Sequence, residues 1–94
     1  MRIVTEAIAG TLESSDALVR VTPSDELQIE VKSSVNAQYG SRIREVVDAT
    51  LAKLGVTEGL ISVDDKGALD FVIAARVEGA VARGSRDAID WRKL

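Results

Sequence analysis

The residues best suited to chemistry in this chain are the two adjacent serines of Glu13-Ser14-Ser15-Asp16, where two hydroxyls stand between two carboxylates. The sequence contains no histidine and no cysteine, and it shows no obvious Ser-Lys pair, so a base that would activate a serine is missing. A serine presented without a base is typical of a protein that receives a group from another enzyme. It is not typical of an enzyme, and we expect no catalytic residues.

The flanks of this segment predict a hairpin. Short apolar runs at 7–12 and 17–22 stand on either side of the four-residue polar link, which would place Ser14 and Ser15 at the hairpin tip. The link lacks Asn-Gly or Asp-Gly, so the turn type stays open. Taken alone, the tetrapeptide is more typical of ordinary turn chemistry, because Ser and Asp are common turn formers.

The rest of the chain changes from a strand period to a helix period. After a polar break at 23–26, apolar residues alternate with polar ones over 27–32, which predicts a strand with one polar face. From about 35 to 54 the apolar spacing becomes three and four, which predicts a helix ending at Gly55, with Ser34 as a candidate cap. Its apolar stripe consists of Ile43, Val46, Val47, Leu51 and Leu54.

A fourth strand is predicted at about 59–63 and a second helix at about 68–83, with Asp65 as its candidate cap. Gly79 weakens this helix but permits close packing. Arg76 is expected to point outward. The predicted apolar stripe consists of Leu69, Val72, Ile73, Val77, Ala80 and Val81.

The order of elements favours an α+β fold. We predict a small two-layer domain with about four strands, including N-terminal antiparallel hairpins, covered on one side by two helices. Residues 1–94 form one domain, with a polar tail from about 85 in which Ile89 and Trp91 would dock on a partner or pack back on the domain. Tyr39 is the remaining large aromatic residue with a polar edge.

Composition excludes several functional classes. The net charge of −3, with acids and bases mixed along the chain, argues against nucleic-acid binding. The absence of an apolar run of 18 residues argues against a membrane span, and the N-terminus lacks the apolar centre of a signal peptide, so we expect a cytoplasmic protein. The lack of cysteine also removes thiolate metal sites.

Two sets of charged residues, the segment 64–67 and the arginines of the predicted helices, each have two possible interpretations. The segment 64–67 lacks the carboxylate pattern of a calcium loop, so we predict a helix-capping turn and no metal, with a docking role for Asp64, Asp65 or Lys66 left open. The helix arginines are predicted to be solvated and paired locally, for example with Glu45 or Glu78, with partner contacts as the alternative. These arginines are Arg42, Arg44, Arg76 and Arg83.

Three stretches give the chain a resemblance to a known family along nearly its whole length. They are Ala9-Gly10-Thr11-Leu12-Glu13-Ser14 with Asp16, Ser33-Ser34-Val35 leading to Gln38-Tyr39-Gly40, and Val63-Asp64-Asp65-Lys66-Gly67-Ala68-Leu69-Asp70. In their order and spacing they resemble the acyl carrier (gamma) subunit of citrate lyase. The resemblance implies that Ser14 carries the prosthetic group 2'-(5''-phosphoribosyl)-3'-dephospho-CoA through a phosphodiester bond. The family typically has glycine at the next position, where this chain has Ser15.

The resemblance also implies partners. A dedicated transferase would attach the group to Ser14. The thiol of the group would carry acetyl and citryl thioesters between an alpha subunit, which exchanges acetyl for citryl, and a beta subunit, which cleaves citryl to oxaloacetate and acetyl. The chain would thus be a non-catalytic subunit, because the reactive sulfur belongs to the cofactor. Glu13 and Asp16 would assist the transferase or simply be solvated turn carboxylates.

Two alternatives to the citrate lyase interpretation stay open at this point. The acyl carrier of malonate decarboxylase uses a similar group and would leave a similar turn serine. A non-covalent adaptor domain would use the two serines only as a turn.

Overall fold

The computed structural model describes residues 1–33 and 37–85, with side chains described from residue 40 onward in the second range. Ser34, Ile89 and Trp91, and the side chain of Tyr39, therefore lie outside the described residues. The elements follow the predicted order: β1 (Ala7–Gly10), β2 (Ala17–Thr22), β3 (Leu27–Ser33), α1 (Ala37–Leu54), β4 (Gly59–Asp65) and α2 (Asp70–Gly84).

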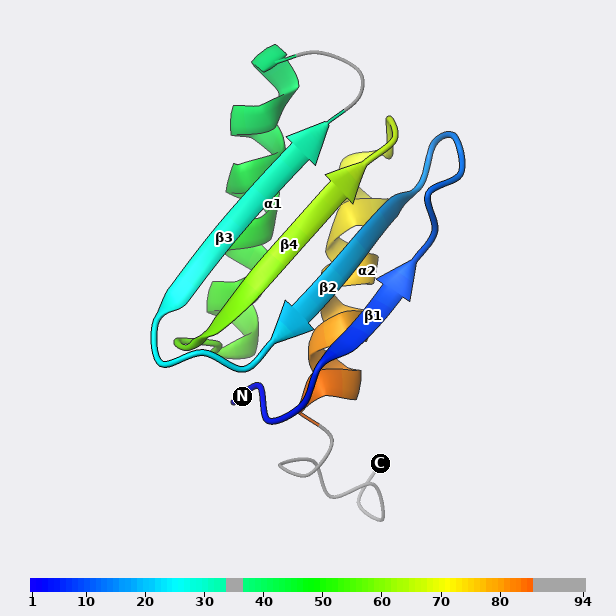
Figure 1. Ribbon diagram of the computed structural model, residues 1–94. Helices are drawn as coiled ribbons and strands as arrows, with labels where there is room; N and C mark the ends of the chain where they lie inside the picture. The colour runs from blue at the N-terminus through cyan, green and yellow to red at the C-terminus, as the bar shows by residue number, and fades with distance from the viewer. Residues whose placement is uncertain (34–36, 86–94) are drawn as a thin grey trace.

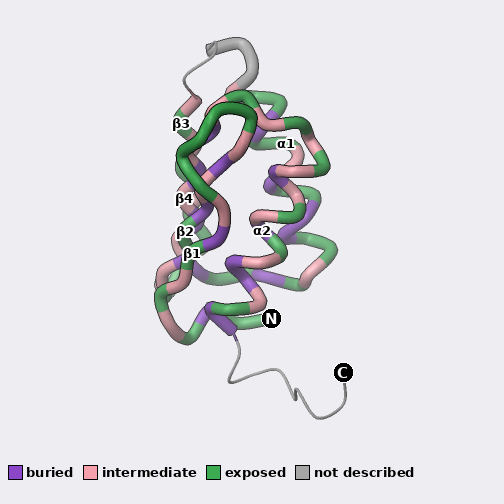
Figure 2. The backbone as a smooth tube through the Cα atoms, turned by 90° about the vertical axis from the view of Figure 1, so that its right-hand side faces the viewer, coloured by how far each residue is buried: buried purple, intermediate pink, exposed green. Residues whose placement is uncertain are grey.

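The two-layer α+β architecture predicted from the sequence is confirmed. One four-stranded sheet forms the first layer, and α1 and α2 lie together against one of its faces (Figure 1). The view from the side shows the strands in one layer and both helices in the other (Figure 2). Buried aliphatic side chains fill the space between the layers, and the largest of them are Leu51, Ile61, Ile73, Val19, Val21, Val47, Val63, Val77 and Val81.

Strand pairing differs from a simple run of hairpins. β1 and β2 form the predicted antiparallel hairpin, but β4 lies between β2 and β3, so that the sheet order is β1-β2-β4-β3. β3 and β4 are parallel, because α1 connects them and carries the chain back to the starting end of the sheet. β2 and β3 therefore do not pair.

The register aligns the aliphatic side chains in rows across the sheet. Val19 of β2 stands beside Val63 of β4, which in turn stands beside Val31 of β3. A row below, Val21, Ile61 and Ile29 repeat the arrangement. Every second residue of β4 from Gly59 to Asp65 is buried, as expected for a central strand covered on one face.

Both helices begin and end close to the predicted residues. Gly55 has a φ of 69° and its N–H donates to Ala52, so it ends α1 in the left-handed conformation that favours glycine. At Gly79 a side-chain Cβ would lie 3.3 Å from the Cβ of Ala9, which confirms that this glycine permits close packing, here of α2 on β1. No helix in the described part of the chain is long and apolar enough to cross a membrane.

Two sequence predictions for the start of α2 are wrong. Asp65 does not cap the helix: the N-cap residue is Leu69, which makes no side-chain cap hydrogen bond, and Asp65 instead accepts the N–H of Ala68 in the preceding loop. Leu69 was predicted to lie in the buried stripe, yet it is 64% exposed. Its position before the first helical residue removes it from the helical period that would have turned it inward.

Candidate functional site

The tip of the β1–β2 hairpin is a four-residue turn from Glu13 to Asp16. The Asp16 N–H donates to the Glu13 carbonyl at 3.2 Å, and Ser15 has a φ of 66°. A positive φ at the third turn residue alone is the pattern of a type II turn, a position that usually holds glycine. Ser15 is the only non-glycine residue with a positive φ among those the structure describes.

Ser14 occupies the second position of this turn. Its residue is exposed, and within the described part of the chain its hydroxyl makes no hydrogen bond. The predicted hairpin position of Ser14 and Ser15 is therefore confirmed. The two serines differ in backbone conformation. Ser15 has the positive φ that the turn requires, whereas the φ of Ser14 is not positive.

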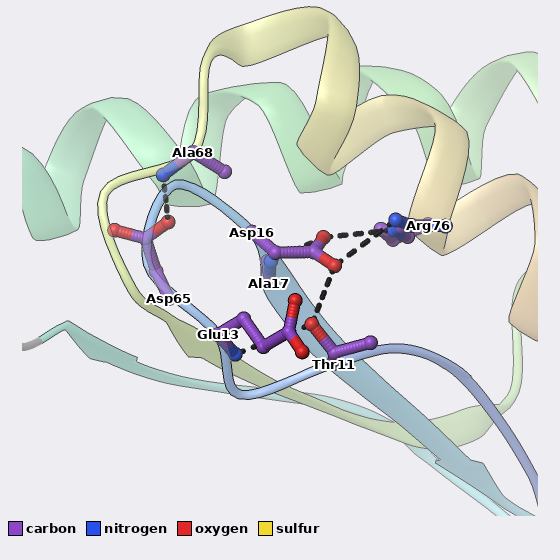
Figure 3. Close-up of polar contacts among 7 residues, drawn as sticks. All are labelled: Thr11, Glu13, Asp16, Ala17, Asp65, Ala68 and Arg76. Carbon is purple, nitrogen blue, oxygen red and sulfur yellow. Dashed lines mark hydrogen bonds and ion pairs between the residues drawn. The ribbon is translucent and has the colours of Figure 1, made fainter.

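Asp16 organises the tip (Figure 3). Its Oδ1 accepts the N–H of Ala17 at 2.7 Å and the Nε–H of Arg76 at 2.9 Å, and its Oδ2 accepts the Thr11 hydroxyl at 2.7 Å and an Nη2–H of Arg76 at 3.0 Å. The Thr11 oxygen in turn accepts the N–H of Glu13 at 3.2 Å. One carboxylate thus ties both sides of the hairpin tip to α2.

The electrostatic state of this carboxylate follows from its partners. The hydrogen bonds from Arg76, then those from Thr11 and the Ala17 N–H, hold the pKa of Asp16 well below its usual range. The same pair raises the pKa of Arg76. Asp16 is therefore ionised and its charge is compensated by a two-point contact with the guanidinium, which fixes geometry as well as charge.

The tip also rests on the loop that follows β4. The N–H of Ser15 donates to the carbonyl of Lys66 at 2.8 Å, and the N–H of Lys66 donates to the carbonyl of Asp16 at 2.9 Å. The loop itself is held by Asp65, which is buried and accepts from Ser33 Oγ at 3.0 Å and from the Ala68 N–H at 2.9 Å. Figure 3 shows the two loops side by side.

Gly10 is required at the base of the tip. It has a φ of 93°, and a Cβ at this position would collide with the carbonyl oxygen of Ala17 and lie 3.0 Å from Cδ of Arg76. Only glycine accepts this backbone without strain. Gly10 thus permits the close approach of the two strands and leaves room for Arg76.

Sequence reasoning missed the ion pair at this site. Arg76 was predicted to point outward and to pair locally, but it contacts Asp16, which is 60 residues away in the chain. Asp16 is accordingly not a freely solvated turn carboxylate, whereas Glu13 is exposed and has no ion pair among the described residues. The spacing of apolar residues on α2 gave no signal of this contact.

The other predicted arginine pairs also differ in their partners. Arg42 pairs with Asp70 at 2.7 Å, and Arg83 donates to the carbonyl of Ile8, so both connect different elements. Glu78 pairs with Lys53 at 3.9 Å. The turn predicted at 64–67 is only partly correct, because β4 continues through Asp65 and the chain leaves the strand at Lys66. The described residues contain no group of three or more His, Cys, Asp or Glu that could hold a metal ion.

The arrangement supports one kind of chemistry. It presents a hydroxyl to solvent from a turn that is fixed by hydrogen bonds to two other elements, and among the described residues no hydrogen bond joins that hydroxyl to a base. Such a hydroxyl can be modified by an enzyme that supplies its own base.

Comparison with known proteins gives the chain its relatives. Residues 4–84 match a family model described as ACP, malonate decarboxylase delta subunit (MdcD). The citrate lyase acyl carrier protein of Albidiferax ferrireducens is 56% identical over 97 residues, covering 100% of this chain and 99% of that protein. The protein of the same name from Haemophilus influenzae strain Rd is 53% identical over 94 residues, with the same coverage of both chains.

Among solved structures, this chain resembles part of a Pseudomonas malonate decarboxylase hetero-tetramer crystallised in complex with malonate. The TM-score is 0.75 at 26% sequence identity, and the match covers 86% of this chain and 84% of that one. The identity is thus about half that shared with the relatives named for citrate lyase.

Proposed function

Because this chain belongs to the citrate lyase acyl carrier protein family, we propose that it is the covalent acyl carrier of a citrate lyase complex, with its prosthetic group attached at Ser14. The observation that carries this assignment is the Ser14 hydroxyl, which is exposed, makes no hydrogen bond to any described residue, and lies on a turn fixed by Asp16 and Arg76. The carrier has no catalytic residues of its own. The cytoplasmic location predicted from the sequence is part of the same proposal.

The tip suits the group that the family resemblance implies, 2'-(5''-phosphoribosyl)-3'-dephospho-CoA. An exposed turn leaves room for a large substituent. Two carboxylates lie close to Ser14 in the sequence: Glu13 is exposed, and the charge of Asp16 is neutralised by Arg76. An anionic phosphodiester at Ser14 therefore meets little repulsion from Asp16. When bound, the group supplies a thiol that carries acyl groups as thioesters.

Loading requires one displacement at phosphorus. The Ser14 Oγ–P bond would form while the bond from that phosphorus to the leaving group of the activated donor breaks, and the hydroxyl proton would pass to a base of the transferase. The donor is an activated phosphate ester bearing the prosthetic group. Since the chain has no histidine or cysteine, neither of these residue types could take the proton or divert an acyl group.

The proposed partners are the prosthetic-group transferase and the alpha and beta subunits. The role of this chain toward the catalytic subunits is to anchor the arm at a turn tied to α2 and to the loop after β4, because Asp16 accepts from Arg76 and the Ser15 N–H donates to the Lys66 carbonyl. An anchored arm keeps its far end at a high effective concentration near both partner sites.

The proposal is tested by mass spectrometry of the protein from its native host. Trypsin cleavage after Arg2 and Arg20 gives a peptide of residues 3–20, which contains Ser14 and Ser15, and fragmentation of that peptide locates the added mass. We expect the prosthetic-group mass on Ser14, its loss in Ser14→Ala, and its retention in Ser15→Ala. A native protein that supports citrate cleavage without any adduct would instead be a non-covalent adaptor.

A carrier for malonate decarboxylase is the second candidate, favoured by the description of the matching family model and by the solved structure. The mass on Ser14 does not separate the two candidates, because both use similar groups. Subunits that copurify with the chain, and citrate or malonate turnover by the reconstituted complex, do separate them. Citrate cleavage is the expected result.

A further inference from the structure

The end of the molecule that bears Ser14 also bears its most exposed large apolar side chains. Among the described residues, Phe71 is 71% exposed, Leu69 is 64% exposed and Leu12 is 55% exposed, and no other large apolar residue exceeds 46%. Leu12 directly precedes the hairpin tip. Leu69 and Phe71 lie at the start of α2, directly after the loop whose Lys66 carbonyl accepts the Ser15 N–H. We call these three side chains the apolar collar.

The position of Leu69 in the collar works against local stability. It is the N-cap residue of α2, yet it makes no side-chain cap hydrogen bond, and leucine is among the poorest residues at an N-cap. Its side chain is not buried in exchange. A residue that breaks a local rule without a gain within the chain points to a contact with something else.

Charges around the collar are mostly paired within the chain. Arg76 pairs with Asp16, Arg42 pairs with Asp70 at 2.7 Å, and Lys66 pairs with Asp64 at 3.5 Å. Within the described residues, Glu13 is the one exposed charge of the tip that has no ion pair. This surface therefore offers a partner apolar area and little net charge, which is the opposite of an electrostatic docking site.

From these observations we propose that the collar of Leu12, Leu69 and Phe71 is the surface by which the enzyme that modifies Ser14 recognises this chain, through an apolar depression beside its transfer site. The inference rests on the proposed modification of Ser14. The modifying enzyme must bring phosphorus to bonding distance from Oγ, so it must cover this end of the molecule. The catalytic subunits, in the proposed function, act on the thioester at the far end of the arm.

The test measures loading and binding separately. Recombinant unmodified chain is incubated with the transferase and the activated donor, and the adduct is followed by intact mass. Phe71→Ser and Leu69→Ser are each expected to raise the KM for the carrier about tenfold, because each removes an apolar side chain that the complex buries. Binding is measured with the same substitutions in a Ser14→Ala background, where transfer is blocked. The Kd of the transferase for these chains is expected to rise by the same factor.

Two controls separate recognition from folding. Leu69→Ser supplies a good N-cap residue and is expected to raise Tm by about 4 °C while loading falls, so the loss cannot come from instability. Leu27→Ser removes a 40% exposed leucine at the start of β3, at the other end of the sheet, and is expected to load like the parent chain.

Salt dependence provides the second readout. Loading through an apolar collar is expected to change less than about threefold between low and high ionic strength, because screening weakens charge contacts and leaves apolar burial intact. Loading of Phe71→Ser and Leu69→Ser at the parental KM, or a steep fall in loading with salt, would overturn the collar. A parent chain that takes no adduct at all would instead overturn the modification of Ser14 itself.

Discussion

Two arginine–aspartate pairs lie near the same end of this molecule, and they connect different elements: one joins the hairpin tip to α2, and the other joins α1 to α2. Arg76 binds Asp16 of the hairpin tip, and the Asp16 side chain is only 14% exposed. Arg42 of α1 binds Asp70 at the start of α2, and the Asp70 side chain is 46% exposed. Asp16 also accepts from Thr11 and from the Ala17 N–H, whereas the Arg42 contacts with Asp70 both go to one oxygen, Oδ2.

The difference shows how the chain fixes the turn that bears Ser14, the proposed attachment point. An exposed pair between two helices that already pack against each other, with Ile43 and Ile73 buried in the same core, adds little to their position. The hairpin tip has no comparable core beneath it, since residues 11–15 are all exposed. A single carboxylate that accepts four hydrogen bonds therefore replaces packing at the turn that exposes Ser14.

The substitution expected to destabilise the hairpin tip most is at Gly10. We expect Gly10→Ala to destabilise the protein by about 3 kcal/mol or more, because a Cβ would strain the positive φ and collide with the Ala17 carbonyl while pushing on Arg76. Denaturant unfolding measures the change. Gly40→Ala is the matched control: a Cβ there meets nothing within 4 Å, and alanine favours the helix, so this change should be neutral or stabilising. Equal losses in the two variants would contradict the account.

The comparison itself is tested by removing each guanidinium. Arg76→Met keeps the apolar stem but removes two of the four hydrogen bonds that Asp16 accepts, and we expect Tm to fall by about 5–10 °C. Arg42→Met should shift Tm by no more than about 2 °C, because its pair is exposed to solvent. Thermal unfolding followed by circular dichroism measures both. Similar falls in Tm for the two variants would show that the Arg76–Asp16 pair stabilises the protein no more than the Arg42–Asp70 pair does.

Acid titration sharpens the same comparison. The partners of Asp16 lower its pKa from an ordinary value of 3.8, so its folded form binds a proton less readily than its unfolded form. The stability that Asp16 contributes is then fully present above that ordinary value and is lost as pH falls below it. Asp16→Asn should therefore be less stable than the parent at neutral pH, and the gap should narrow below about pH 4. A gap that does not depend on pH would refute a charge-based role.

Much of this fold could be predicted from the sequence because its signals are local. The hairpin at 7–22 was predicted from two apolar runs around a polar link. The helix ending at Gly55 was predicted from the spacing of its apolar residues and from the glycine after it. The insertion of β4 between β2 and β3 could not be predicted from these signals, since pairing between strands distant in sequence leaves no mark in the period of either strand.

The site divides in the same way. Ser14 was placed correctly on the tip because turn chemistry is local. The support for it was missed, because Arg76 reads as one more polar residue between apolar positions of α2 and nothing near it in sequence points to Asp16. Leu69 was assigned to the buried stripe because the helix was predicted to begin at 68, two residues before its observed start at Asp70.

The smallest expected effect is at Ser15 and has the opposite sign. Its left-handed φ of 66° is strained for serine, and glycine would relieve that strain while adding some entropy to the unfolded chain. We expect Ser15→Gly to stabilise the protein by about 0.5 kcal/mol, measured by denaturant unfolding, and to leave the adduct on Ser14 intact.

Ser14→Gly is the matched control for this substitution. The φ of Ser14 is not positive, so glycine there relieves nothing and only adds freedom to the unfolded chain, and a loss of about 0.5 kcal/mol is expected. Opposite signs at two adjacent serines would separate their roles without reference to the prosthetic group, because stability then identifies Ser15 as the residue that shapes the turn. Losses at both positions would mean that the Ser15 hydroxyl contributes more to the tip than its backbone costs.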